Sequence, residues 1–109
     1  MNREELFKLH KEVSKVALDI MKKKNNDYAG TNGDNPFANF TRTEAMGIAS
    51  TEAGFLCRIT DKVSRLSTFA SAGELKVDNE SYYDAILDII NYCILFHGYV
   101  SSKEGELYD

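Results

Sequence analysis

The sequence is poor in the residues that build metal centres, disulfide scaffolds and membrane spans. It holds two cysteines, Cys57 and Cys93, with no CxxC pair and no Cys/His spacing typical of zinc. We therefore expect two buried thiols in a reducing compartment. No apolar run approaches the roughly 18 residues that a spanning helix needs, and the N-terminal MNREELFKLH is too charged for a secretory signal. These absences predict a cytoplasmic protein with no membrane partner.

Basic residues are also in deficit. The 109 residues carry 17 acids against 13 lysines and arginines, a net charge of −4, which disfavours direct binding to nucleic acid. The run Lys22, Lys23 and Lys24 is better explained as favourable charge at the end of a helix than as a nucleic-acid patch. The length suits a single domain, residues 1–109, with a core from about 2 to 100.

Hydrophobic periodicity predicts an all-α fold, an antiparallel bundle of three long helices plus one short helical turn. The first helix is expected from residue 2 to about 24, capped by Asn2. A single turn is expected at 43–46, followed by a second long helix from a Ser50 or Thr51 cap to about residue 70. The third long helix is expected from a cap at Asp78 or Asn79 to about His97. Gly73 breaks the connection before it, Gly98 ends it in a left-handed conformation, and the tail 101–109 frays.

The segment 25–41 lacks a helical pattern and is expected to be a long loop. Gly30, Gly33 and Pro36 punctuate it, and loops of this length are usually functional or disordered. Three aromatic residues argue against disorder: Tyr28, Phe37 and Phe40. They would either fold over a ligand or cap one end of the bundle.

The final helix, ESYYDAILDIINYCILF, is apolar almost all round. Such a helix is normally buried on most sides, and in so small a chain this predicts extra burial in an oligomer. One stripe is acidic, because Glu80, Asp84 and Asp88 recur every four residues, with Asn91 three further on. Buried carboxylates cost several kcal/mol each unless they are paired or bind a cation.

A charged face on the second long helix is expected to meet this acidic stripe, and it is formed by Arg58, Asp61, Lys62 and Arg65. Two interpretations are open. In the first, the two faces form an internal salt-bridge network. In the second, they enclose a nucleotide: carboxylates hold Mg²⁺, and the cations grip phosphates. The metal ligands would be Asp61, Glu80, Asp84 and Asp88, and Tyr28 or Phe37 would stack on a base.

Four segments together resemble a known family: KKKNNDYAG (22–30), NPFANF (35–40), RITDKVSRL (58–66) and VDNESYYDAILDIINYCILF (77–96). They are similar to the nucleotide modification associated domain family of phages and bacteria, itself distantly similar to the MazG-like and dimeric dUTPase all-α nucleotide pyrophosphatases. The resemblance implies a helical dimer or tetramer that binds a nucleotide, with Mg²⁺ as its cofactor. The family pattern stresses Asp27, Tyr28, Asn39, Arg58, Asp61, Lys62, Arg65, Glu80, Asp84, Asp88 and Tyr92.

Three functions follow from these patterns. The first is Mg²⁺-dependent hydrolysis of a nucleoside triphosphate to monophosphate and pyrophosphate, with Asp84, Asp88 and Lys62 as catalytic residues. The second is a module that binds or sequesters a nucleotide without chemistry. The third is a purely structural helical oligomer. The ExxE and ExxD pairs of the MazG-like enzymes are missing, because Phe55 follows Glu52 and Tyr83 follows Glu80 at the third position. This difference supports the second function.

Overall fold

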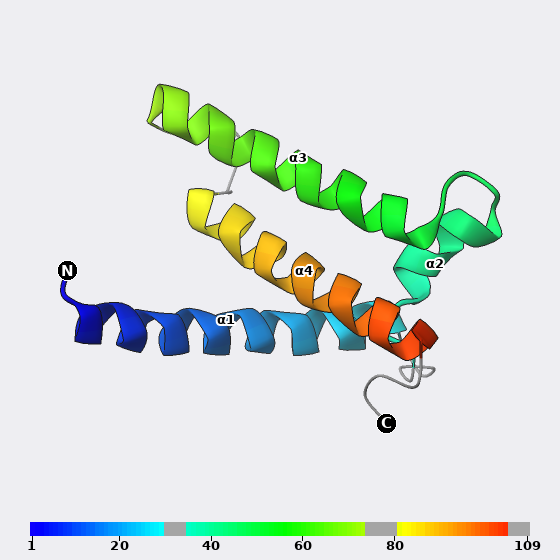
Figure 1. The fold of residues 1–109 in the computed structure, drawn as a ribbon, viewed down its shortest axis with the longest axis horizontal. Coiled ribbons are helices and arrows are strands. Elements are labelled where there is room, and N and C mark those ends of the chain that lie inside the picture. The colour runs from blue at the N-terminus through cyan, green and yellow to red at the C-terminus, as the bar shows by residue number, and fades with distance from the viewer. Residues whose placement is uncertain (30–34, 74–80, 105–109) are drawn as a thin grey trace.

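The computed structural model describes residues 1–29, 35–73 and 81–104, and within these ranges all regular structure is helical. The helices are α1 (Arg3–Ala29), α2 (Ala38–Ala45), α3 (Thr51–Ala72) and α4 (Tyr82–Glu104). Figure 1 shows the four packed together, with α4 between α1 and α3 and with α2 at one end. The predicted all-α fold is confirmed.

The directions of the helices differ in part from the predicted bundle. α3 runs antiparallel to α4, as expected, whereas α1 runs in the same general direction as α4 (Figure 1). The reason lies in the connections. α2 and its flanking turns carry the chain across the end of the bundle, so α3 starts at the end of the molecule where α1 and α4 finish (Figure 1).

Local signals placed several helix ends correctly. Asn2 caps α1, because its Oδ1 accepts a hydrogen bond from the Glu5 backbone N–H at 2.8 Å. Ser50 caps α3, because its Oγ accepts from the Ala53 N–H at 3.1 Å. Gly73 ends α3 in the left-handed conformation, at φ 77°. The predicted caps Asp78 and Asn79 lie outside the described residues.

The predicted loop 25–41 was wrong at both ends. α1 continues to Ala29, and α2 begins at Ala38 rather than as a single turn at 43–46. Tertiary packing explains the second difference, because Phe40 on α2 is only 7 % exposed and stacks on Phe55 with ring centroids 4.3 Å apart. A helix supported by such a contact needs no strong local propensity.

The predicted end of the last helix was also wrong. α4 runs through Gly98 to Glu104, so residues 101–104 are helical rather than frayed. A Cβ at position 98 would lie 3.4 Å from the ring of Phe37. The glycine therefore gives Phe37 space against α4 and does not terminate the helix.

Aromatic packing joins α2, α3 and α4 at one end of the molecule. We call this the aromatic junction, formed by Phe37, Phe40, Phe55, Tyr92, Phe96 and Tyr99. Phe55 is its centre, with 0 % of its surface exposed, and it lies against Phe40, Phe96 and Tyr99 with ring centroids 4.3 to 6.2 Å apart. Phe37 packs edge-on against Tyr99 at 5.8 Å. Two of the three loop aromatics thus cap the bundle, and the side chain of Tyr28 lies outside the described residues.

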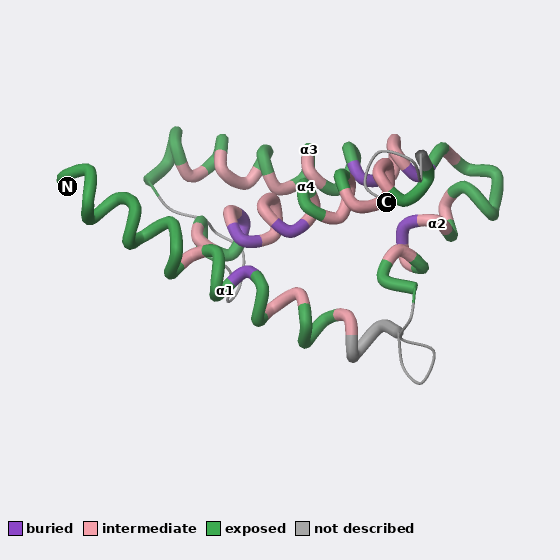
Figure 2. The backbone as a smooth tube through the Cα atoms, turned by 60° about the horizontal axis from the view of Figure 1, so that its bottom comes forward, coloured by how far each residue is buried: buried purple, intermediate pink, exposed green. Residues whose placement is uncertain are grey.

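The opposite end is open. Residues 1–12 are all exposed, and Figure 2 shows this part of α1 standing clear of the other helices. α4 is also covered on only part of its circumference. By length and composition alone, Tyr82–Lys103 could cross a membrane, with a mean hydropathy of 1.2 and 17 % of its most apolar window buried. The count of uninterrupted apolar residues did not anticipate this, and core helices of soluble bundles meet the same criterion.

Candidate functional site

A cavity of about 280 Å³ lies between the four helices. Its walls combine apolar side chains, which are Leu18, Met21, Pro36, Phe40 and Leu95, with polar ones, and small-molecule sites use both kinds. The polar side chains come from all four helices: Lys22, Lys24, Asn25, Asn39, Arg58, Asp88, Asn91 and Tyr92. Of the predicted site residues, four meet here: Asn39, Arg58, Asp88 and Tyr92.

Arg58 supplies a cation at the border of this cavity. Its guanidinium carbon lies 4.7 Å from the centroid of the Phe40 ring, within the range of a cation–π contact. Among the described residues no carboxylate pairs with Arg58. The ring holds the guanidinium in place, and its hydrogen-bond donors are not committed to an acid.

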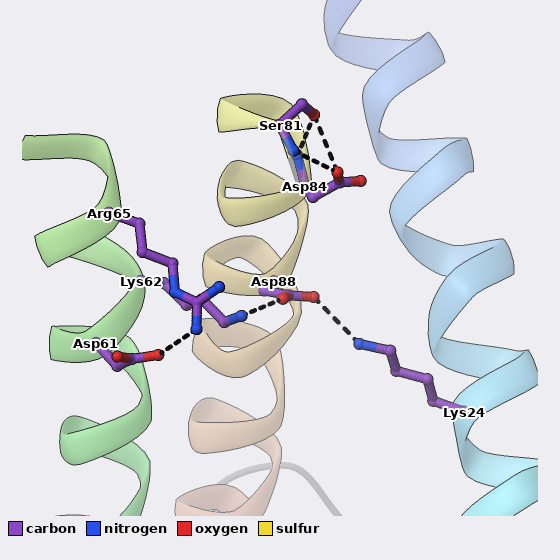
Figure 3. A network of polar contacts seen from close by, with 7 residues as sticks. All are labelled: Lys24, Asp61, Lys62, Arg65, Ser81, Asp84 and Asp88. Atoms are coloured by element: carbon purple, nitrogen blue, oxygen red, sulfur yellow. Dashed lines mark hydrogen bonds and ion pairs between the residues drawn. The ribbon is translucent and has the colours of Figure 1, made fainter. Parts of the chain in front are cut away.

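Asp88 ties three helices together (Figure 3). Its carboxylate accepts hydrogen bonds from Lys62 on α3 at 2.9 Å and from Lys24 on α1 at 3.2 Å. Burial alone would raise the pKa of Asp88, but the hydrogen bond from Lys62 and the charge of Lys24 outweigh it, so the pKa lies below its ordinary value. The charged face of α3 does meet the acidic stripe of α4, and at Asp88 the contact is an ion-pair network.

Asp84 is used to start α4. Its Oδ2 accepts from the Ser81 backbone N–H at 2.8 Å, and the Asp84 N–H donates to the Ser81 Oγ at 3.2 Å (Figure 3). This reciprocal pair is a capping box with aspartate in place of glutamate. Asp61 instead pairs with Arg65 on its own helix at 3.4 Å, and its side chain is 60 % exposed.

The described residues therefore do not bring Asp61, Asp84 and Asp88 together. No group of three or more His, Cys, Asp or Glu side chains with metal-binding geometry occurs in the described ranges, and Glu80 lies outside them. The donor set that Mg²⁺ prefers is several oxygens, whereas Asp88 lies between two ammonium groups. The predicted Mg²⁺ site stays a prediction.

A second, shallower hollow of about 370 Å³ adjoins the cavity. Arg58 and Tyr92 line both spaces, and the hollow adds Asp61, Lys62 and Cys57. Lys62 and Arg58 thus face an open, polar space next to an apolar one. Cys57 and Cys93 are exposed free thiols, so the prediction that both are buried was wrong.

Of the two predicted base-stacking residues, the structure describes the side chain of Phe37 but not that of Tyr28. Phe37 is engaged with Tyr99 in the aromatic junction, so its ring is not a free platform beside the cavity. The backbone of Asp27 and Tyr28 belongs to α1, but their side chains lie outside the described residues. Phe40 and Tyr92 are the aromatic residues in the described ranges that line the cavity.

Sequence reasoning missed Asn91 as a site residue. It is 7 % exposed and lines the cavity, and its Nδ2 donates to the carbonyl of Ala17 on α1 at 2.9 Å. No group in the described part of the chain donates to its Oδ1. Its place as the only uncharged member of the stripe was the available signal, because a buried amide in an apolar helix has to find partners.

Lys24 was missed for a different reason. It was assigned to a helix end, but α1 continues for five residues past it. It therefore lies on the body of the helix, beside the cavity and within reach of Asp88.

A separate ion pair closes the far end of the bundle. Lys103 on α4 contacts Glu52 on α3 at 3.2 Å. The pKa of Glu52 is lowered, mainly because its carboxylate accepts a hydrogen bond from its own backbone N–H and also because it accepts one from Lys103. The Glu52 carboxylate in turn raises the pKa of Lys103. This pair joins α3 and α4 and is not part of the cavity.

Comparison with protein-family models, with curated proteins and with solved structures finds no match to this chain. The resemblance to the nucleotide modification associated domain family therefore stays a prediction. The function has to be argued from the cavity itself.

Proposed function

We propose that the chain binds a nucleotide in the cavity between its four helices, as a binding module without hydrolytic chemistry. The observation that carries the proposal is Arg58, a cation held on an aromatic ring where an apolar cavity meets an open polar hollow. A guanidinium matches the geometry of a phosphate. The apolar cavity beside it suits a flat apolar ring system attached to that phosphate.

The apolar part of the cavity suits a base and sugar. Its volume of about 280 Å³ lies just below the usual range for small-molecule sites, which begins at about 300 Å³. Leu18, Met21 and Leu95 offer apolar contact. The amides of Asn39 and Asn91 offer the few hydrogen bonds that orient such a ligand.

The phosphates would lie toward the hollow, between Arg58 and Lys62. Lys22 and Lys24 add positive charge from α1 on the other side. Among the described residues that line the cavity, Asp88 is the one carboxylate that offsets the charge of these cations. The surplus of positive charge favours an anionic ligand.

Binding is favoured over hydrolysis because Asp84 and Asp88 are already engaged in other interactions. Hydrolysis by Asp84, Asp88 and Lys62 would need a metal held by several carboxylates. Asp84 instead caps α4, and Asp88 would have to exchange two lysines for the metal. The purely structural alternative accounts for Asp88 and for the contact of Arg58 with Phe40, but it leaves the hydrogen-bond donors of Arg58 without a use.

A thermal-shift screen tests the proposal. Nucleoside mono-, di- and triphosphates are each tested with and without Mg²⁺. A ligand at 100 times its dissociation constant adds about 2.7 kcal/mol, a shift of roughly 10 °C for a domain of this size. We expect a shift that needs no Mg²⁺, with the nucleotide recovered intact.

Arg58→Gln should abolish that shift, because it removes the charge and the fork of donors. The matched control is Arg42→Gln, an exposed arginine on α2 that does not line the cavity, and it should leave the shift unchanged. Consumption of a triphosphate in the presence of Mg²⁺ would replace the binding module with the hydrolase. No shift with any nucleotide would leave the structural alternative.

A further inference from the structure

The side-chain amide of Asn91 has a hydrogen-bond partner for its nitrogen and none for its oxygen. Asn91 is buried in the middle of α4 and lines the cavity. Its Nδ2 donates to the Ala17 carbonyl on α1 at 2.9 Å, whereas no group in the described ranges donates to its Oδ1. The great majority of buried polar atoms in folded proteins are hydrogen-bonded, and an unpaired one is costly. The oxygen therefore points to a partner that the described part of the chain does not supply.

The bond to Ala17 decides what kind of partner this is. An asparagine amide carries donors on its nitrogen and an acceptor on its oxygen. Turning the amide over would set Oδ1 of Asn91 against the carbonyl oxygen of Ala17, and two acceptors do not bond. The orientation of the amide is therefore fixed by α1, and the partner of Oδ1 has to be a hydrogen-bond donor.

Asn91 lies in the part of the site where the base would enter. Arg58 and Tyr92 line both the cavity and the polar hollow beside it, whereas Asn91 lines the cavity and not the hollow. The neighbours of Asn91 along the cavity wall are apolar, with Leu95 one turn further on α4 and Leu18 next to Ala17 on α1. A ligand whose phosphates lie toward the cations of the hollow would therefore bring its other end, the base, to Asn91.

We propose that Asn91 selects the base, because its Oδ1 accepts a hydrogen bond from an exocyclic amino group. This inference rests on the proposed nucleotide function and names the class of ligand, which is an adenine or cytosine nucleotide. Adenine and cytosine carry an amino donor at the position where guanine and thymine carry a carbonyl oxygen, and hypoxanthine and uracil carry the same oxygen there. An oxo base would place that oxygen against Oδ1 in apolar surroundings, and both acceptors would be left unpaired.

Isothermal titration of the wild-type chain with matched nucleotides tests the selection. The mono- and triphosphates of adenosine are compared with those of inosine, which differ from them in the base alone. A sugar hydroxyl cannot produce a difference within such a pair. We expect the inosine nucleotides to bind roughly 10-fold to 100-fold more weakly, the range that follows when buried polar groups are left unpaired. Cytidine and uridine nucleotides form a second pair and should differ in the same direction.

A substitution then assigns the selection to Asn91. Asn91→Leu replaces the amide with an apolar side chain of similar size, so adenosine and inosine nucleotides should bind it with similar affinity. The matched control is Asn25→Leu, which replaces another amide that lines the cavity and should keep the ratio of the two affinities. Asn91→Leu also loses the bond to Ala17, so its titrations are made at a temperature where circular dichroism shows the folded chain.

The outcomes separate this inference from the function on which it rests. Equal binding of adenosine and inosine nucleotides to the wild-type chain, or tighter binding of inosine, would overturn the role of Asn91 and leave the nucleotide site in place. A preference for adenosine that persists in Asn91→Leu would assign the selection to another residue. No binding of any of these nucleotides would refute the nucleotide site and the selection together. If Asn91→Leu fails to fold, the nucleotide pairs on the wild-type chain still decide.

Discussion

The two ends of this bundle are built from similar residues and have opposite surroundings. At the aromatic junction, Phe55 is fully buried among rings from α2 and α4. At the open end, Phe7 is 60 % exposed on the first turns of α1, which no other described element covers. Apolar residues alone therefore do not determine where the core forms. The junction has a core because the chain crosses the bundle there and adds α2, whereas the open end has no crossing helix in the described ranges.

The largest effect is expected from one substitution made at both ends. Phe55→Ala should cost about 3–5 kcal/mol of unfolding free energy, because it empties a fully packed position. Phe7→Ala should change the free energy by no more than about 0.5 kcal/mol. Urea unfolding monitored by circular dichroism measures both. Equal losses would show that the open end is as tightly packed as the junction.

Asp88 lies between the two ends and holds the long helices together. Asp88→Asn should cost about 1–3 kcal/mol, because Lys62, only 14 % exposed, loses its counter-charge. The matched control is Asp19→Asn, whose pair with Lys15 is exposed on both sides and should be worth little. A loss no greater than that of the control would mean that the network does not fasten the helices.

The pH dependence of stability gives a second test of Asp88. Its pKa is lowered in the folded chain, so its contribution is present above the unfolded value of about 3.9 and is lost as the pH falls through the folded value. The difference in unfolding free energy between wild type and Asp88→Asn should be constant from neutral pH to about pH 5. It should shrink in more acidic solution. A difference that grows on acidification would contradict the ion pairs.

The smallest effect is expected inside the junction. Gly98 is helical, and an added methyl group would only just touch the Phe37 ring, at 3.4 Å. Gly98→Ala should therefore stabilise the chain by about 0.5–1 kcal/mol, the usual gain over glycine in a helix. Gly98→Leu should destabilise it by displacing Phe37. Destabilisation by alanine would show that the aromatic junction is packed too tightly to take one more methyl group. The difference in packing between the junction and the open end would then be larger than described.

The parts of the fold that depend on local chemistry could be predicted from the sequence. Asn2, Ser50 and Gly73 act within one helical turn, and all three were placed correctly. α2 could not be predicted, because its support is the stacking of Phe40 on Phe55 across two elements. Gly98 was misread because a glycine near a helix end has two uses, a left-handed stop or space for a neighbour.

The candidate site was predicted in the same uneven way. The meeting of Lys62 with Asp88 follows from two helices joined by a short connection. The contact of Lys24 with Asp88 could not be predicted in this way, because Lys24 lies on α1 and no short connection joins α1 to α4. Asp84 was assigned to metal binding on its spacing alone, whereas its spacing from Ser81 equally fits a helix cap.

The hydrogen bond from Asn91 to the Ala17 carbonyl also fixes how far α1 is shifted along α4. An apolar stripe that repeats every turn would allow α1 to slide by about 5.4 Å with little change in the area it buries. Only a small side chain leaves a helical carbonyl open to an approaching amide, and neighbouring positions on the stripe carry Val13 and Ile20. A slipped pairing would leave the Asn91 amide buried without an acceptor, which is costly. One amide thus selects a single alignment of the two helices, and with it the shape of the space between them.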